Sequence, residues 1–71
     1  MNQMIFNYKN AEIFVCVMNI NTEEIQSLVF NTVQDFQNSN ICDKNHILLR
    51  AYVNDKRWYI ESPMEFARSL Y

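Results

Sequence analysis

The chain has 71 residues, of which 49% are hydrophobic, and its six basic and eight acidic side chains give a net charge of −2 at pH 7. A domain of this size buries only roughly 60% of the surface that its unfolded chain exposes, which disfavours a deep catalytic cleft. The acidic balance, with no basic run longer than Lys56-Arg57, disfavours a nucleic-acid-binding protein.

Two strands are predicted in the first part of the chain. Residues 3–8 form the first, and Lys9-Asn10 is a two-residue turn into the second, with Phe6 opposite Ile13 in the resulting hairpin. Residues 13–18 are consecutively apolar and rich in β-branched and aromatic types, which predicts an interior strand. Alternate side chains point to opposite faces, so Phe14, Cys16 and Met18 lie on the face opposite Ile13, Val15 and Val17. Both faces therefore need a covering layer or a partner.

Residues 22–37 are predicted to form the main helix. Asn21 would be its N-cap, with Glu24 completing a capping box, and this position in the first turn also explains the acidic pair Glu23-Glu24. Apolar residues follow at spacings of three and four, which would place one stripe against the sheet: Ile25, Leu28, Val29, Val33 and Phe36.

A polar connector at residues 38–45 precedes a second pair of strands. Residues 46–54 alternate, with Ile47, Leu49, Ala51 and Val53 on the helix side and Leu48, Arg50 and Tyr52 on the other. A tight turn within residues 54–56 leads into a strand over residues 57–61, whose Trp58 and Ile60 face the helix. The loop is either Asn54-Asp55 or Asp55-Lys56, and both registers keep each side chain on the same face. Since the chain has no glycine, Asn10 and Asn54 are expected at positions of positive φ.

The segment Ser62-Pro63-Met64-Glu65 is a second capping box with proline at the first helical position. It predicts a short helix from Pro63 to near the C-terminus that presents Phe66, Ala67 and Leu70.

The expected fold is therefore a single α+β domain over residues 1–71, in the order ββαββα. It has one small antiparallel or mixed sheet of three to four strands packed on one main helix, with a short C-terminal helix. The strand order is open: residues 3–8 either join a β-grasp-like mixed sheet or leave a three-stranded βαββα sheet. Whether the C-terminal helix covers the second face of the sheet is also open.

The residues that could carry chemistry do not make an enzyme or a metal site. Cys42 and His46 lie four apart, but with Cys16 inside a strand they fall short of the four ligands of structural zinc. No glycine is present to bring backbone amides close to a substrate, so a Cys42/His46 nucleophilic pair lacks an oxyanion hole. We expect no metal, no cofactor and no catalysis. The two cysteines, with no signal peptide or membrane-spanning run, predict reduced thiols, a cytoplasmic location and no membrane contact.

The second face of the sheet is the candidate protein-binding surface. Aromatic, methionine and arginine side chains with a polar rim are typical of such surfaces. The expected contact residues are Phe14, Met18, Leu48, Arg50, Tyr52, Arg57 and Tyr59. Three alternatives are open: the C-terminal helix covers this face as a second small core, the face pairs with itself in a homodimer, or Lys56-Arg57 with Trp58 and Tyr59 contacts nucleic acid.

The segment Arg50-Ala51-Tyr52-Val53-Asn54-Asp55-Lys56-Arg57 resembles the terminal hairpin of small phage-encoded antitoxins of the Dmd type. The whole chain is similar to the compact, glycine-poor proteins that phages use against host defence systems. The resemblance implies a non-catalytic inhibitor that sterically occludes the active or nucleic-acid site of a host defence or toxin protein, and no functional residue is carried over from it. The alternative is a homo-oligomeric structural or regulatory domain.

Overall fold

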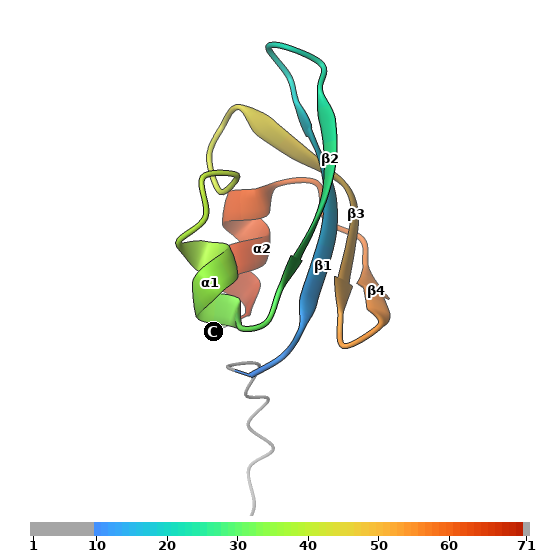
Figure 1. Cartoon of the computed structure of the whole chain (residues 1–71), viewed down its shortest axis with the longest axis vertical. Helices are drawn as coiled ribbons and strands as arrows, with labels where there is room; N and C mark the ends of the chain where they lie inside the picture. The colour runs from blue at the N-terminus through green and yellow to red at the C-terminus, as the bar shows by residue number, and fades with distance from the viewer. Residues whose placement is uncertain (1–9, 71) are drawn as a thin grey trace, which may run out of the picture.

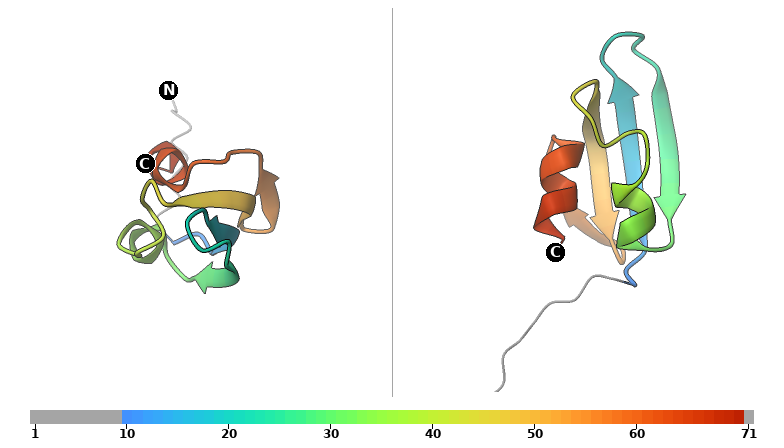
Figure 2. Two further views of the ribbon diagram at one scale, coloured as in Figure 1. Left: turned by 90° about the horizontal axis from the view of Figure 1, so that it is seen from above. Right: turned by 90° about the vertical axis from the view of Figure 1, so that its left-hand side faces the viewer.

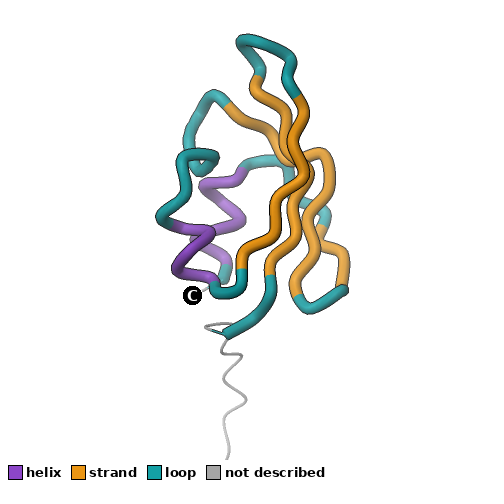
Figure 3. The backbone as a smooth tube through the Cα atoms, viewed as in Figure 1, coloured by secondary structure: helices purple, strands orange, loops and turns teal. Residues whose placement is uncertain are grey.

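One four-stranded antiparallel sheet lies against two helices in the computed structural model, which describes residues 10–70 (Figure 1). The order across the sheet is β2-β1-β3-β4. Figure 3 marks the strands, helices and loops along the backbone by colour. The α+β class and the short C-terminal helix are confirmed. The elements are β1 (Ile13–Asn19), β2 (Ile25–Phe30), α1 (Val33–Gln37), β3 (His46–Val53), β4 (Lys56–Trp58) and α2 (Pro63–Ser69).

Strand β1 is the interior strand that its apolar run predicts. It pairs with β2 along one edge and with β3 along the other, and the side chains of Ile13, Val15 and Val17 are fully buried. The predicted strand at residues 3–8 lies outside the described residues. Because both edges of β1 are paired over residues 13–18, β1 has no edge left for a third strand there.

The predicted main helix over residues 22–37 is wrong, because only Val33–Gln37 is helical and residues 25–30 form strand β2. The apolar spacing of this segment fits a helix, but Leu28 and Phe30 also alternate in the way that a strand requires. Both of these side chains pack against the core. The interior position of β1 decides the outcome, since its backbone groups need a hydrogen-bonding neighbour on this edge.

The predicted N-cap at Asn21 is also wrong. The side chain of Asn19 accepts hydrogen bonds from the backbone N–H groups of Asn21 (2.8 Å) and Thr22 (3.2 Å), which folds residues 20–24 into a hairpin loop between β1 and β2. The helix begins instead at Thr32, whose hydroxyl accepts a hydrogen bond of 3.1 Å from the N–H of Asp35. The pattern Thr32-x-x-Asp35 is the capping signal that marks the true start.

A β-bulge in β3 changes the predicted faces of its first half. Cys16 lies opposite Arg50, but the next residue, Val17, lies opposite Leu48, so Leu49 is the extra residue. Leu48 is therefore buried in the core at 4% exposure, whereas Leu49 is 41% exposed. The prediction that Ile47 and Leu49 face the helices and that Leu48 faces away is wrong. Beyond the bulge, Ala51 and Val53 are buried as expected.

The β3–β4 turn uses Asn54-Asp55, the first of the two expected loops. Val53 pairs with Lys56, and the two loop residues have φ angles of 49° and 70°. Positive φ at both central residues is the geometry of a type I′ turn, which matches the twist of the flanking strands. Asn54 thus adopts the positive φ that the sequence predicts for it.

Both helices cover the same face of the sheet (Figure 2). Phe36 of α1 and Phe66 of α2 are fully buried, with ring centroids 5.2 Å apart, and Phe66 also contacts Trp58 at 5.4 Å. The Nε2 atom of Gln37 donates a hydrogen bond of 3.0 Å to the carbonyl of Ala67, which joins the two helices. The alternative in which α2 covers the second face of the sheet is therefore wrong.

Truncating Phe36 tests this single aromatic core. Phe36→Ala removes the ring that contacts both Phe30 and Phe66, so we expect the free energy of unfolding to fall by about 3–5 kcal/mol. Urea titration followed by circular dichroism measures the change. Met64→Ala, on the exposed side of α2, is the control and should change stability by less than about 1 kcal/mol. Equal effects of the two changes would contradict the core assignment.

The helix start is tested by comparing two possible caps. Thr32→Ala removes the acceptor for the Asp35 N–H and should cost about 1 kcal/mol of stability, whereas Asn21→Ala should cost clearly less because its side chain caps no helix. Thermal unfolding of the two variants under the same conditions measures the difference. A larger loss of stability for Asn21→Ala would contradict the helix start at Thr32 and favour the longer helix over residues 22–37.

Candidate protein-binding site

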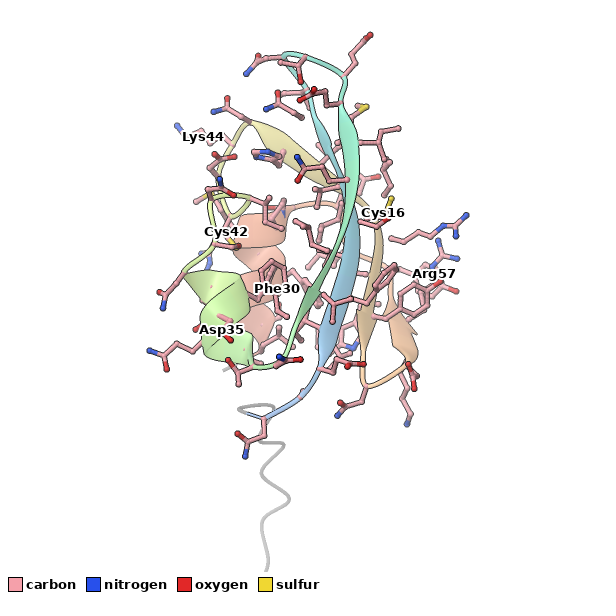
Figure 4. The ribbon with its side chains drawn as sticks, viewed as in Figure 1. Cys16, Phe30, Asp35, Cys42, Lys44 and Arg57 are labelled. Atoms are coloured by element: carbon pink, nitrogen blue, oxygen red, sulfur yellow. The ribbon has the colours of Figure 1, made fainter. Side chains whose placement is uncertain are left out.

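The face of the sheet that points away from both helices is largely apolar. Residues directly opposite each other in neighbouring strands project on the same side, so the pairing registers define which side chains share this face. Figure 4 shows Cys16 and Arg57 on this side, whereas Phe30 and Cys42 lie on the helix side. We call this surface the open face, and it consists of Phe14, Cys16, Met18, Ile25, Ser27, Val29, Ile47, Arg50, Tyr52, Arg57 and Tyr59.

An aromatic pair occupies the middle of the open face. Phe14 of β1 lies opposite Tyr52 of β3, and their ring centroids are 5.7 Å apart at an interplanar angle of 49°. The row continues to Val29 in β2 and to Arg57 in β4, so it crosses all four strands. Both rings are half-buried and present apolar surface on a rigid, hydrogen-bonded support.

Two arginines and a tyrosine border this aromatic pair. The guanidinium carbon of Arg57 lies 4.8 Å from the centroid of the Tyr59 ring, and Tyr59 is 85% exposed. Arg50 is exposed, and within residues 10–70 neither arginine forms an ion pair. Arg50 and Arg57, together with Glu61, also line a hollow of about 370 Å³ beside the bulge. Such guanidinium groups are free to meet a carboxylate from another molecule.

The structure brings six of the seven predicted contact residues together on the open face and leaves one out. Leu48 is buried in the core because of the bulge, so its assignment to the binding surface is wrong. The prediction missed Ile25 and Val29, which are 60% and 57% exposed on this face. The sequence pattern puts them on the helix stripe, and their exposure on this face follows only from the strand that forms there instead.

Cys42, Asp43 and His46 do not form a nucleophilic site. The His46 Nδ1 atom contacts the Asp43 carboxylate at 2.7 Å, and this hydrogen bond lowers the pKa of Asp43. The Cys42 thiol donates instead to the carbonyl of Phe36 at 3.2 Å. Burial raises the pKa of Cys42, because a thiolate there would lose hydration. The thiol therefore lacks both a base and the lowered pKa that activates a nucleophile.

Three further features of the described residues concern metal binding, membrane crossing and nucleic-acid contact. Among residues 10–70, no three His, Cys, Asp or Glu side chains gather in a way that could hold a metal ion. The helices of the same residues are too short and too polar for any of them to cross a bilayer. Trp58, the aromatic of the alternative nucleic-acid patch, packs against the core as expected, which removes its ring from base stacking.

Comparison with protein-family models, with curated proteins and with solved structures finds no match to this chain. Function is therefore inferred from the open face and its chemistry.

The reactivity of Cys42 tests its assignment as a structural thiol. In a Cys16→Ser variant the remaining thiol is Cys42, and its alkylation by iodoacetamide should rise with pH and reach half its maximal rate at a higher pH than an unfolded cysteine does, because burial raises the pKa of this thiol. Mass spectrometry after timed quenching measures the rate, with a short unfolded peptide containing one cysteine as the reference. A plateau already reached near neutral pH would identify an activated thiolate instead.

Proposed function

We propose that this chain is a non-catalytic protein-binding module and that the open face is its docking surface. The observation that supports this proposal is the placement of both helices on one face of the sheet, because no element within residues 10–70 covers the aromatic side chains on the other. A small monomeric domain rarely leaves a continuous apolar sheet face in water unless that face has a partner.

The chemistry of the open face defines the kind of partner. Tyr52 and Tyr59 offer large apolar area with a polar tip, which is typical of residues that anchor interfaces. Arg50 and Arg57 lie beside them and have no carboxylate partner within residues 10–70. The partner therefore carries an apolar patch flanked by acidic side chains, whose carboxylates pair with the two guanidinium groups.

The mode of action that we propose is steric occlusion. The resemblance of residues 50–57 to the hairpin of Dmd-type antitoxins suggests an inhibitor of a host defence or toxin protein, acting in the cytoplasm of the host. A hydrogen-bonded sheet changes little on binding, so it can cover an active or nucleic-acid site without the entropy cost of ordering a loop. Occlusion needs no catalytic residue in the inhibitor.

The second candidate function is a homo-oligomeric structural or regulatory domain. Ile25 and Val29 favour it, because these exposed apolar side chains lie on the outermost strand of the sheet. The two candidates differ in which part of the sheet makes the contact, the middle of the open face or its edge.

Tyr52→Ala tests the docking surface. The change removes the ring from the middle of the open face, so we expect binding to a partner captured from host lysate to weaken by more than about 2 kcal/mol. The helix-side core is untouched and only the contact with Phe14 is lost, so the free energy of unfolding should fall by less than about 2 kcal/mol, well below the loss expected for Phe36→Ala. Isothermal titration calorimetry of the purified partner and urea titration of the same variant measure the two quantities.

Met64→Ala is the matched control, since Met64 is an exposed apolar residue on α2, away from the sheet. It should leave the affinity unchanged. A partner that binds Tyr52→Ala as tightly as it binds the native chain, or that loses affinity through Met64→Ala, contradicts the proposal.

A further inference from the structure

The two outer edges of the sheet differ in their protection against pairing with another strand. Strand β4 is three residues long and carries Lys56 and Arg57, which is a common way to block an edge. Strand β2 is six residues long, has no charged residue and no proline, and exposes Ile25 and Val29. A long, neutral, β-prone strand at an edge is a template for a further strand.

The outer backbone groups of β2 can be assigned from the hairpin. The N–H of Asn19 donates to the carbonyl of Glu24 at 2.9 Å, so these two residues form a hydrogen-bonded pair. Such pairs alternate along an antiparallel ladder, and the backbone groups of Gln26, Leu28 and Phe30 therefore turn toward β1. Those of Ile25, Ser27 and Val29 turn outward, and within residues 10–70 no strand other than β1 pairs with β2.

Strand β2 is complementary to a second copy of itself. A two-fold axis perpendicular to the sheet, passing midway between the two copies of Ser27, places Ser27 opposite the partner's Ser27 and Ile25 opposite the partner's Val29. Each residue whose backbone N–H and C=O groups turn outward then lies opposite another such residue, so the two can exchange a pair of hydrogen bonds. Because residues 25–30 carry no charge, no like charges oppose each other across the contact.

We propose that two copies of this chain associate through antiparallel pairing of β2 with β2, forming one continuous eight-stranded sheet. The outer edges of this joined sheet are the two short, cationic β4 strands, so assembly stops at the dimer instead of continuing into a fibre. The axis is perpendicular to the sheet, and both open faces therefore lie on the same side. This contact is made by the backbone edge of β2, whereas the Phe14–Tyr52 pair proposed for the protein partner lies in the middle of the open face.

The mass in solution, measured by sedimentation equilibrium over a range of concentrations, tests the dimer. The native chain should pass from 8.6 kDa to twice that mass as its concentration rises. Ser27→Pro removes one outward N–H without removing a bond to β1, and it should weaken dimerisation at least about tenfold. Ser27→Ala keeps the N–H and should dimerise as the native chain does.

A pair of double variants tests the register and does not depend on the folding of Ser27→Pro. I25K/V29K places lysine opposite lysine at both ends of the contact and should weaken dimerisation strongly. I25K/V29E places lysine opposite glutamate and should dimerise clearly better than I25K/V29K. Circular dichroism confirms that each variant keeps its sheet.

Three results would overturn the proposal. One is a native chain that stays at 8.6 kDa up to millimolar concentration. Another is a dimer that forms equally well in I25K/V29K and I25K/V29E, which would place the contact elsewhere. The third is a dimer that Tyr52→Ala abolishes, which would indicate packing of one open face on another. A monomeric chain whose partner binding is still weakened by Tyr52→Ala would overturn this dimer alone and leave the proposed function intact.

Discussion

The pairing of β1 along both of its edges is the interaction on which the rest of this structure depends. The strand is apolar on both faces, so it has to be interior, and the hairpin to β2 and the longer connection to β3 supply its two neighbours. Once both edges are filled, Ile13, Val15 and Val17 define one face of the sheet and Phe14, Cys16 and Met18 define the other. The positions of the two helices then determine which of these faces is covered.

A chain of this length covers only one of them. Helix α1 has five residues and would not form alone in water, so its stability depends on the contacts of Phe36 with Phe30 and Phe66. Helix α2 joins the same cluster through Phe66, which also contacts Trp58 of β4. Concentrating these rings into one core gives each helix a well-packed contact, whereas one short helix on each face would have left two thin layers. The open face is thus a direct result of how the small core is assembled.

The parts of the fold that the sequence predicts correctly are those with a local physical signal. Strand β1 follows from its apolar run, α2 from Ser62 and Pro63, and the position of the β3–β4 turn from the polar residues 54–56, although the choice between its two registers came from the structure. The prediction for residues 22–37 is wrong because their apolar spacing fits both a helix and a strand. The strand forms because β1 needs a hydrogen-bonding neighbour, which is a tertiary effect that the local sequence does not show. The bulge at Leu49 fails for a similar reason, since register depends on the partner strand.

The same distinction explains the candidate site. Tyr52, Arg57 and Tyr59 share a face because side chains alternate along a strand in any register, so six of the seven predicted residues come together. Leu48 is the exception because the bulge lies between it and the others. The exposure of Ile25 and Val29 on this face could be predicted only if residues 25–30 were assigned to a strand and not to a helix.

Asn54 has a consequence for how the chain folds. Its φ of 49° forms the fast, local turn between β3 and β4, while its side chain accepts a hydrogen bond from the N–H of Glu12 at 3.0 Å, across 42 positions of sequence. Its own N–H donates to the carbonyl of Glu12, also at 3.0 Å. Glycine would meet the dihedral angle but would lack the side-chain acceptor. Asn54 thus takes part both in a local turn, which forms quickly, and in a contact between residues far apart in the sequence, which forms slowly. Once the β3–β4 hairpin docks on β1, the hydrogen bonds between Asn54 and Glu12 hold the two together.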